Sequence, residues 1–361
     1  MRNLIRPFLV AAAALLLPLA VQAEPQPQTI RFGEVGGSNV KSEGGKPQGT
    51  GLVALAEYLH LFEKEFGPNG PKIEEVFFSG TGPAQNEALA QGAIDFGTYG
   101  GVPNVIGLAN RIPAHIVATR RSSGTGNYYL GVRADSPYRT LADLKGKRIA
   151  VQKGTNPHQT LVLLIESNGL RDDDFKITNL QGNEAVVALN AGAVDAVFGG
   201  VNLLILRDRQ QLRLVGGTRD FQQAPSQSGV LVADAFASKY PDTVARVVKV
   251  LTDVSHWASE ESHREALLQF LAARSIGYQY VKEDYEGSLR ERFNPLLDES
   301  SVAAYVEIVK FAVSHQLIRK APDEATVRSW FAPQYQQAAL QQLQLADYWP
   351  KSGALLQVAK R

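Results

Sequence analysis

The chain has 361 residues, of which 44% are hydrophobic, and its 37 basic and 36 acidic residues leave a net charge of +1. This balance excludes the concentrated positive surface of a nucleic-acid-binding protein, so no nucleic-acid partner is expected. The absence of cysteine excludes disulfides, thiolate metal ligands, cysteine nucleophiles and a lipidated cysteine. The six histidines lack the spacing of metal ligands, and we expect neither a metal nor another cofactor.

The N-terminal segment predicts export. Arg2 and Arg6 precede an apolar run from Phe8 to Ala20, and small residues lead to Ala23. A basic start, a short apolar core and small residues before the cleavage point are typical of a secretory signal peptide, here residues 1–23. The run is short for a membrane span, which makes an uncleaved anchor the weaker alternative. Without a lipidated cysteine, we expect a soluble product in the periplasm.

The first part of the mature chain alternates strand-like and helical runs. Strands are predicted at 29–33, 73–78 and 114–118, and the residues from 52 to 66 have the apolar spacing of an amphipathic helix. Residues 34–50 are rich in Gly, Ser and Lys, and we expect no regular element there.

The alternation continues in the second part. Strands are predicted at 127–132, 148–151 and 229–232, and a helix at 157–168. Beyond Asp242 the pattern is mostly helical, as expected for helices that cover a finished sheet.

One pattern occurs twice, at 91–102 and 191–201. Each copy follows a short apolar helical stretch and contains Gly-Ala, a β-branched residue, Asp, an apolar strand and a Gly-Gly pair. A glycine that ends a helix, followed by a strand and a glycine loop, is typical of one unit of an open α/β sheet. Such sheets place ligands at the carboxyl ends of their strands.

Two copies about 100 residues apart predict two similar α/β lobes. We expect the first lobe to comprise residues 24–127 and 231–361, including a helical C-terminal tail, and the second lobe to comprise 128–230. The chain would cross between them near 126–130 and 229–232. A ligand cleft is expected between the lobes, which would close on a small molecule.

The run from Leu141 to Thr155, with Leu-Lys-Gly-Lys at its centre, resembles solute-binding proteins of ABC importers. The most similar branch binds aliphatic sulfonates, taurine and nitrate, and both copies of the repeat match it at the expected distances. The resemblance extends from about residue 29 to 236. It implies the type II periplasmic binding protein fold, with mixed sheets flanked by helices and a cleft between the lobes. It also implies a small organic anion as ligand, permease subunits in the inner membrane as partners, and a monomer.

Two departures from that family concern the ligand. Sulfonate binders of this branch typically carry Gly-Asp after the first repeat and Trp-Asp-Pro after the second, where this chain has Gly100-Gly101 and Gly199-Gly200. The loss of an indole and two carboxylates predicts a wider, less acidic cleft and a ligand bulkier than taurine, such as an aryl or longer alkyl sulfonate or sulfate ester. The alternative is that the long segment 34–50 folds over the gap and restores a small pocket.

The candidate ligand-binding residues lie at strand ends and helix starts, where unpaired N–H groups favour anions. Arginine suits an oxyanion because its guanidinium donates two parallel hydrogen bonds, and His158 could donate one more. The alternatives are ordinary helix caps for the threonines and solvated surface groups for the arginines and His158. The set is Ser79, Thr81, Gly82, Tyr99, Gly100, Gly101, Arg120, Arg121, Thr155, Asn156, His158, Gly199, Gly200 and Asn202.

The favoured function is capture of a sulfonate or sulfate ester for an ABC importer. A periplasmic sensor is a second hypothesis, which the sequence does not separate from transport. An enzyme similar to a pyrimidine synthase of thiamine biosynthesis is a third. That enzyme group is cytosolic with a cysteine-rich motif, whereas this chain lacks cysteine, a nucleophile elbow, a phosphate loop and a dinucleotide motif. We therefore expect no catalytic site.

Overall fold

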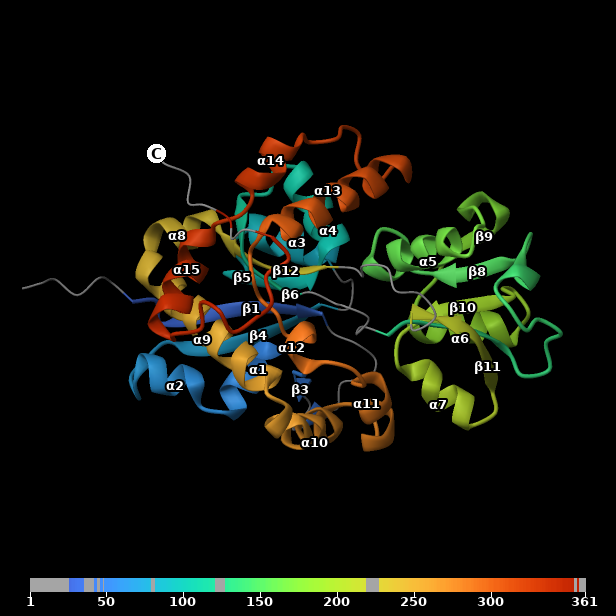
Figure 1. Cartoon of the computed structure of the whole chain (residues 1–361), viewed down its shortest axis with the longest axis horizontal. Coiled ribbons are helices and arrows are strands. Elements are labelled where there is room, and N and C mark those ends of the chain that lie inside the picture. Colours follow the sequence, from blue (N-terminus) through green and yellow to red (C-terminus); the bar gives the residue numbers. More distant parts are fainter. Residues whose placement is uncertain are drawn as a thin grey trace, which may run out of the picture.

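The computed structural model describes residues 26–35, 42–43, 46–47, 49–78, 82–120, 127–218, 227–353 and 356. The predicted signal peptide lies outside these residues. Within them, no helix combines the length and apolar character needed to cross a bilayer. The strands form two five-stranded sheets and a two-stranded pair, and helices flank both large sheets (Figure 1).

The first sheet has the order β4-β1-β5-β12-β6. β12 runs antiparallel to both of its neighbours, whereas β1 is parallel to β4 and β5. Its strands are β1 (Thr29–Val35), β4 (Lys72–Phe78), β5 (Phe96–Gly100), β6 (Ala114–Arg120) and β12 (Ser228–Ala233).

The second sheet repeats this topology. Its order is β11-β7-β10-β8-β9, and β7 is the antiparallel strand in the place of β12. Its strands are β7 (Tyr129–Arg133), β8 (Arg148–Val151), β9 (Lys176–Asn179), β10 (Ala196–Gly199) and β11 (Leu212–Gly217). We call each sheet with its own helices the first and the second lobe.

Helices cover the faces of both sheets (Figure 1). In the first lobe, the helices that precede β7 in the chain are α1 (Leu52–Tyr58), α2 (Leu61–Phe66), α3 (Gly82–Ala90) and α4 (Gly101–Ala109). The second lobe has α5 (Asn156–Ser167), α6 (Gly182–Asn190) and α7 (Asn202–Asp208), with 3-10 turns η1 (Ala142–Leu144) and η2 (Asp172–Asp174).

The C-terminal part is helical, as the sequence predicts, and it packs mainly around the first sheet (Figure 1). It contains α8 (Asp234–Lys239), α9 (Pro241–Ser259), the turn η4 (Glu261–His263), α10 (Arg264–Arg274), α11 (Tyr278–Asp284), α12 (Leu289–Arg292), α13 (Glu299–Ser314), α14 (Glu324–Ser329) and α15 (Pro333–Gln342).

The repeated sequence forms the same structure in both lobes. Gly92 and Gly192 have φ angles of 66° and 71°, in the left-handed region that ends a helix at low cost only for glycine. The aspartate three residues later then accepts hydrogen bonds from an arginine on the neighbouring strand. Asp95 Oδ2 lies 2.8 Å from Arg31 N, and Asp195 Oδ2 lies 2.9 Å from Arg148 N.

Each lobe has its own apolar core. In the first lobe, Phe32 of β1 stacks on Phe96 of β5 at a centroid distance of 5.0 Å, and Phe236 of α8 contacts Phe96 edge-on. The second lobe has one buried cluster on each face of its sheet, one including α5 and the other α6 and α7. Burial of these side chains is the main term that stabilises both lobes.

The structure corrects several details of the sequence prediction. Residues 34–50 include the end of β1 and a short antiparallel pair, β2 (Ser42–Glu43) and β3 (Lys46–Pro47), where no element is predicted. The pair Gly100-Gly101 is a tight strand-to-helix turn, in which Gly100 ends β5 and Gly101 begins α4. In the second pair Gly199 ends β10, and α7 begins only at Asn202. β12 joins the first sheet from Ser228 onward, ahead of the predicted boundary at 231. The remaining lobe boundaries stay predictions.

Candidate functional site

The candidate site lies where strands of the first sheet end. β1, β5 and β6 are parallel, and antiparallel β12 starts where they finish. Glu34 pairs in register with Thr98, and Ser228 pairs with both Gly100 and Arg120. Because alternate residues of a strand share a face, Glu34, Thr98, Ser228 and Arg120 lie on one face at this edge.

Arg120 supplies positive charge at this edge. It ends β6, its side chain is exposed, and it forms no ion pair with any carboxylate in the described part of the chain. A guanidinium without a counterion among the described residues is available for the parallel hydrogen bonds that an oxyanion accepts.

Glu34 brings a carboxyl group to the same edge, which the sequence analysis missed. Its side chain is buried, with 8% of the residue exposed, and its Oε1 has no hydrogen-bond partner among the described residues. Burial raises the pKa of Glu34 to about 8; the nearby Glu75 carboxylate raises it further, while Arg120 and Thr98 lower it. The signal available in the sequence was an acid directly after a buried strand.

Asn156 joins the two lobes beside this edge. It begins α5 in the second lobe, and its Nδ2 donates to the carbonyl of Gln227 at 3.1 Å. Its Oδ1 accepts from the backbone N–H of Val102 in α4 at 3.1 Å. A Cβ on Gly100 would lie 2.5 Å from Asn156 Oδ1, so only glycine allows this approach. The space that Gly100 leaves is therefore filled by Asn156.

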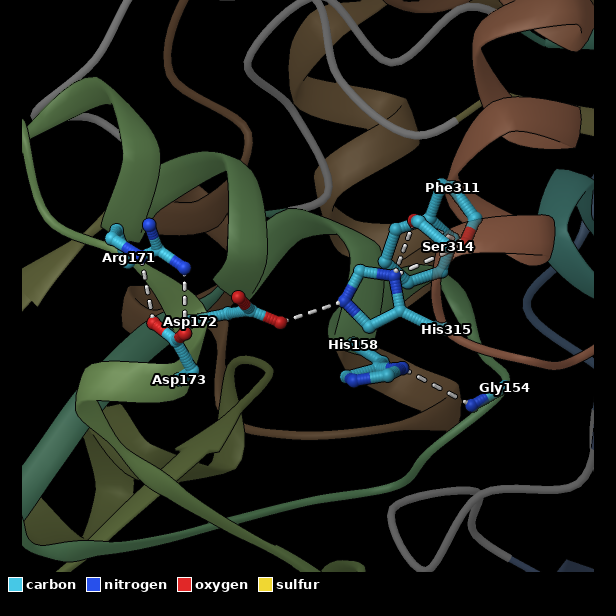
Figure 2. Close-up of polar contacts among 8 residues, drawn as sticks. All are labelled: Gly154, His158, Arg171, Asp172, Asp173, Phe311, Ser314 and His315. Carbon is cyan, nitrogen blue, oxygen red and sulfur yellow. Dashed lines mark hydrogen bonds and ion pairs between the residues drawn. The ribbon is translucent and has the colours of Figure 1, made fainter.

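A second junction between the lobes contains two histidines (Figure 2). Nε2 of His315, at the end of α13 in the first lobe, lies 3.0 Å from Asp172 Oδ2 in the second lobe. The ring of His158 packs against that of His315 at a centroid distance of 5.2 Å. Backbone N–H of Gly154 donates to His158 Nδ1 at 3.4 Å. Burial lowers the pKa of His158 to about 4, with His315 and Lys153 adding to the effect.

A third junction involves the C-terminal part. Arg207 of α7 forms a bidentate ion pair with Glu283 of α11, at 2.7 Å for Nη1–Oε1 and 2.9 Å for Nη2–Oε2. Asn127 Nδ2 donates to the carbonyl of Asp284 at 2.8 Å. α11 therefore fixes the second lobe to helices that otherwise pack around the first.

The other predicted site residues of the first lobe differ in their surroundings. Gly82 begins α3 and is buried against Pro103 of α4. Tyr99 is 3% exposed, and its hydroxyl donates to Asn86 Oδ1 at 2.5 Å, so we leave it out of the proposed site. The N–H of Gly101 donates to the carbonyl of Gln227 at 2.6 Å. The predicted residues Ser79, Thr81 and Arg121 lie outside the described residues.

In the second lobe, Thr155 is buried and its hydroxyl donates to the carbonyl of Gln152 at 2.5 Å. The Gly199-Gly200 pair follows β10, and a Cβ added at Gly200 would meet nothing within 4 Å. Asn202 begins α7, and its Oδ1 is buried without a hydrogen-bond partner in the described part of the chain. The space beside Gly200 is therefore open and the Asn202 Oδ1 near it is unpaired among the described residues, whereas the space beside Gly100 is filled by Asn156.

The described residues contain no group of three or more His, Asp or Glu side chains placed to hold a metal ion. A surface hollow of about 360 Å³ lies on the second lobe, lined by Arg133, Ala134, Asp135, Asn190 and Gln211. It shares no residue with the predicted site.

Comparison with solved structures assigns this architecture to a known class. A periplasmic sulfonate-binding protein from Methylobacillus flagellatus KT matches with a TM-score of 0.75 and 28% identity, over 93% of this chain and 100% of that chain. A desulfurization enzyme matches with a TM-score of 0.67 and 18% identity, over 88% of this chain and 100% of that chain. The fold is that of the periplasmic binding proteins, and it also occurs in an enzyme.

Sequence comparison gives the family. The model described as "ABC transporter, phosphonate, periplasmic substrate-binding protein" matches residues 72–273. A relative from Escherichia coli K12, named for binding aliphatic sulfonates, is 34% identical over 286 residues, which cover 75% of this chain and 79% of the relative. The chain belongs to the family of periplasmic substrate-binding proteins of ABC transporters.

Proposed function

We propose that this protein captures an organic sulfonate or sulfate ester in the periplasm and delivers it, as a monomer, to the permease of an ABC importer. The observation that carries the ligand class is Arg120, an exposed guanidinium without a described carboxylate partner at the strand-end edge. The relatives named for sulfonates support the same class.

The proposed ligand bridges the lobes. Its oxyanion contacts Arg120, and its organic part extends toward Gly199, Gly200 and Asn202, where a side chain at residue 200 would meet no atom within 4 Å. A ligand larger than taurine fills this space and buries apolar surface, which favours binding by about 25 cal/mol per Å². Contacts such as Asn156 to Val102 hold the lobes together around it.

A thermal-shift screen tests the ligand class. The panel is hexanesulfonate, hexyl sulfate, benzenesulfonate, taurine, nitrate, hexanoate and the neutral hexanesulfonamide, in a buffer whose own molecule carries no sulfonate group. A ligand at a hundred times its Kd stabilises the folded state by about 2.7 kcal/mol, a rise of roughly 4 °C in Tm for a chain of this length. We expect that rise from hexanesulfonate, hexyl sulfate or benzenesulfonate and none from hexanesulfonamide. A rise with taurine or nitrate alone would contradict the larger ligand.

The proposal includes transport without catalysis. Deletion of the gene should abolish growth on the bound sulfonate as sole sulfur source while leaving growth on sulfate intact. Normal growth of the deletion strain on that sulfonate would contradict an import role. Because the fold also occurs in a desulfurization enzyme, purified protein incubated with the ligand should be assayed for sulfite, and we expect none to be released.

A further inference from the structure

The buried carboxyl of Glu34 lies beside Gly51, the N-cap of α1, where an added Cβ would be 3.2 Å from Glu34 Oε2. Its Oε1 makes no hydrogen bond within the described residues, although only 8% of the residue is exposed. The hydroxyl of Thr98, its register partner on β5, is also buried and lies close enough to Glu34 to lower the pKa of that carboxyl. Burying such groups without hydrogen bonds costs free energy, and groups of this kind at a strand-end edge are suited to contact a ligand.

Glu34 and Arg120 lie on the same face of the first sheet, close to the ends of its parallel strands. The register from Glu34 through Thr98 and Val230 to Ala118 runs straight across the sheet, and Arg120 lies two residues beyond Ala118 on the same face. Arg120 is close enough to influence the charge of Glu34. An ionised carboxylate here would repel the proposed anion and compete for the guanidinium, whereas a neutral carboxylic acid would offer an O–H donor.

The groups facing Glu34 favour the neutral acid. Glu75 on β4 is a nearby acid, and burial together with Glu57 of α1 raises its own pKa to about 7, while Arg274 of α10 lowers it. Two groups oppose this effect: Arg120 and Thr98 lower the pKa of Glu34 and so favour its ionised form. Burial is the largest effect, and it places the pKa of Glu34 at about 8, so the group is mostly protonated at neutral pH.

We propose that Glu34 is a neutral carboxylic acid which donates a hydrogen bond to the bound oxyanion beside Arg120, so that anion capture weakens at alkaline pH. This inference rests on the proposed function, because it assigns one more ligand contact to the same site. The proton stays on Glu34 during binding. Loss of that proton at higher pH converts the donor into a repelling charge.

The test is calorimetric titration with hexanesulfonate from about pH 6 to about pH 9.5, because the sulfonate itself does not titrate in this range while Glu34 does. The Kd of the wild-type protein should be constant at low pH and rise above about pH 8 with a limiting slope of about tenfold per pH unit. Glu34→Gln keeps an N–H donor and cannot ionise, so its Kd should stay near the low-pH value throughout. Glu34→Leu should bind about tenfold more weakly at pH 6, without the alkaline loss.

Glu75→Gln is the matched control, because it removes the neighbouring charge but leaves the proposed donor. It should move the alkaline loss to lower pH without weakening binding at pH 6. Wild-type protein that binds with a constant Kd over the whole range would overturn the inference and leave the proposed function intact. An alkaline loss that persists in Glu34→Gln would also overturn it. Failure to bind any sulfonate or sulfate ester at pH 6 would overturn both.

Discussion

Asn156 is the residue on which the contact between the lobes most depends. One amide satisfies a backbone acceptor at Gln227 and a backbone donor at Val102, and the residue is 6% exposed. The sequence predicts that Gly100 and Gly101 widen the cleft. Because Asn156 fills the space beside Gly100, and because Asn156 and the Gln227 carbonyl already accept from the N–H groups of Val102 and Gly101, the proposed anion site moves toward Arg120 and Glu34.

Asn156→Ala should weaken sulfonate binding by about fivefold, because it leaves the Val102 N–H without its partner at about 1 kcal/mol, whereas the Gln227 carbonyl still accepts from the Gly101 N–H. The contacts exist only while the lobes touch, so small-angle scattering should show a larger radius of gyration for the ligand-saturated variant than for wild type. Asn168→Ala is the control: Asn168 lies at the other end of α5 and bonds only within the helix, to the Leu164 carbonyl. Equal affinity and equal dimensions in Asn156→Ala and wild type would show that the lobes do not need this amide.

At the scale of elements, the repeated arginine–aspartate pair joins two neighbouring strands in each lobe. The aspartate precedes β5 or β10, and the arginine lies on β1 or β8. Each aspartate accepts from the backbone N–H and the guanidinium of its arginine, on β1 in the first lobe and β8 in the second. The side chain of Asp95 is 7% exposed and that of Asp195 is 21% exposed. Because hydrogen bonding to Arg148 lowers the pKa of Asp195, its contribution to stability is present at neutral pH and is lost as the pH falls through the acidic range.

Asp95→Ala should lower the free energy of unfolding by about 2 kcal/mol and Asp195→Ala by about 1 kcal/mol, since the more buried pair is screened less by water. Hydrogen exchange locates each effect: Asp95→Ala should increase exchange in the first sheet and Asp195→Ala in the second. Asp347→Ala is the control, because it removes an exposed ion pair with Lys351. The side chain of Asp347 is 91% exposed, so this variant should change the free energy of unfolding little. Increased exchange in both sheets of either variant would mean that the lobes unfold as one unit.

The spacing of glycine and apolar residues made the helices and strands of the repeat predictable from the sequence. Contacts between residues far apart in the chain could not be predicted in this way. Gly92 and Gly192 mark helix ends because their φ angles favour glycine, and apolar runs indicate β1, β5 and β10. The strand β9 was missed because Lys176 and Asn179 leave it no apolar alternation. The strand β11 was missed although Leu212, Arg213 and Leu214 do alternate, because this alternation covers only three residues before two glycines. The approach of Asn156 to Gly100 depends on how the lobes meet, and no local spacing contains that information.

At the scale of the whole molecule, polar contacts among the described residues join the lobes at three places. These are the Asn156 amide, the His315–Asp172 pair and the Arg207–Glu283 pair. The histidine junction (Figure 2) combines the contact of His315 with Asp172 across the lobes with a buried neighbouring imidazole, that of His158. Burial lowers the pKa of His158, and the neighbouring His315 lowers it further.

His158 should make the protein less stable in mild acid. Its pKa is about 4 in the folded protein and about 6.5 in an unfolded chain. Between these values the unfolded chain binds more protons, so stability is complete above about pH 6.5 and decreases as the pH falls toward 4. The loss should approach roughly 3 kcal/mol. His158→Gln keeps a polar acceptor for the Gly154 N–H and should flatten this dependence in urea titrations at several pH values.

His60→Gln is the control for that experiment, because the side chain of His60 is 79% exposed. It should leave the acid dependence of stability as it is in the wild-type protein. If the free energy of unfolding of His158→Gln fell with decreasing pH as it does in the wild-type protein, the loss of stability in acid would belong to other groups and not to the buried imidazole of His158.

The most direct measurement is a calorimetric titration of the wild-type protein and Arg120→Ala with hexanesulfonate, and with hexanesulfonamide as the neutral analogue, at neutral pH in a buffer without sulfonate groups. We expect one site per chain for hexanesulfonate, no saturable heat from the sulfonamide, and affinity about tenfold or more weaker in Arg120→Ala, since a charged hydrogen bond is worth about 1.5–3 kcal/mol. Equal binding of the sulfonamide, or unchanged sulfonate affinity in Arg120→Ala, would contradict an oxyanion site at the end of β6.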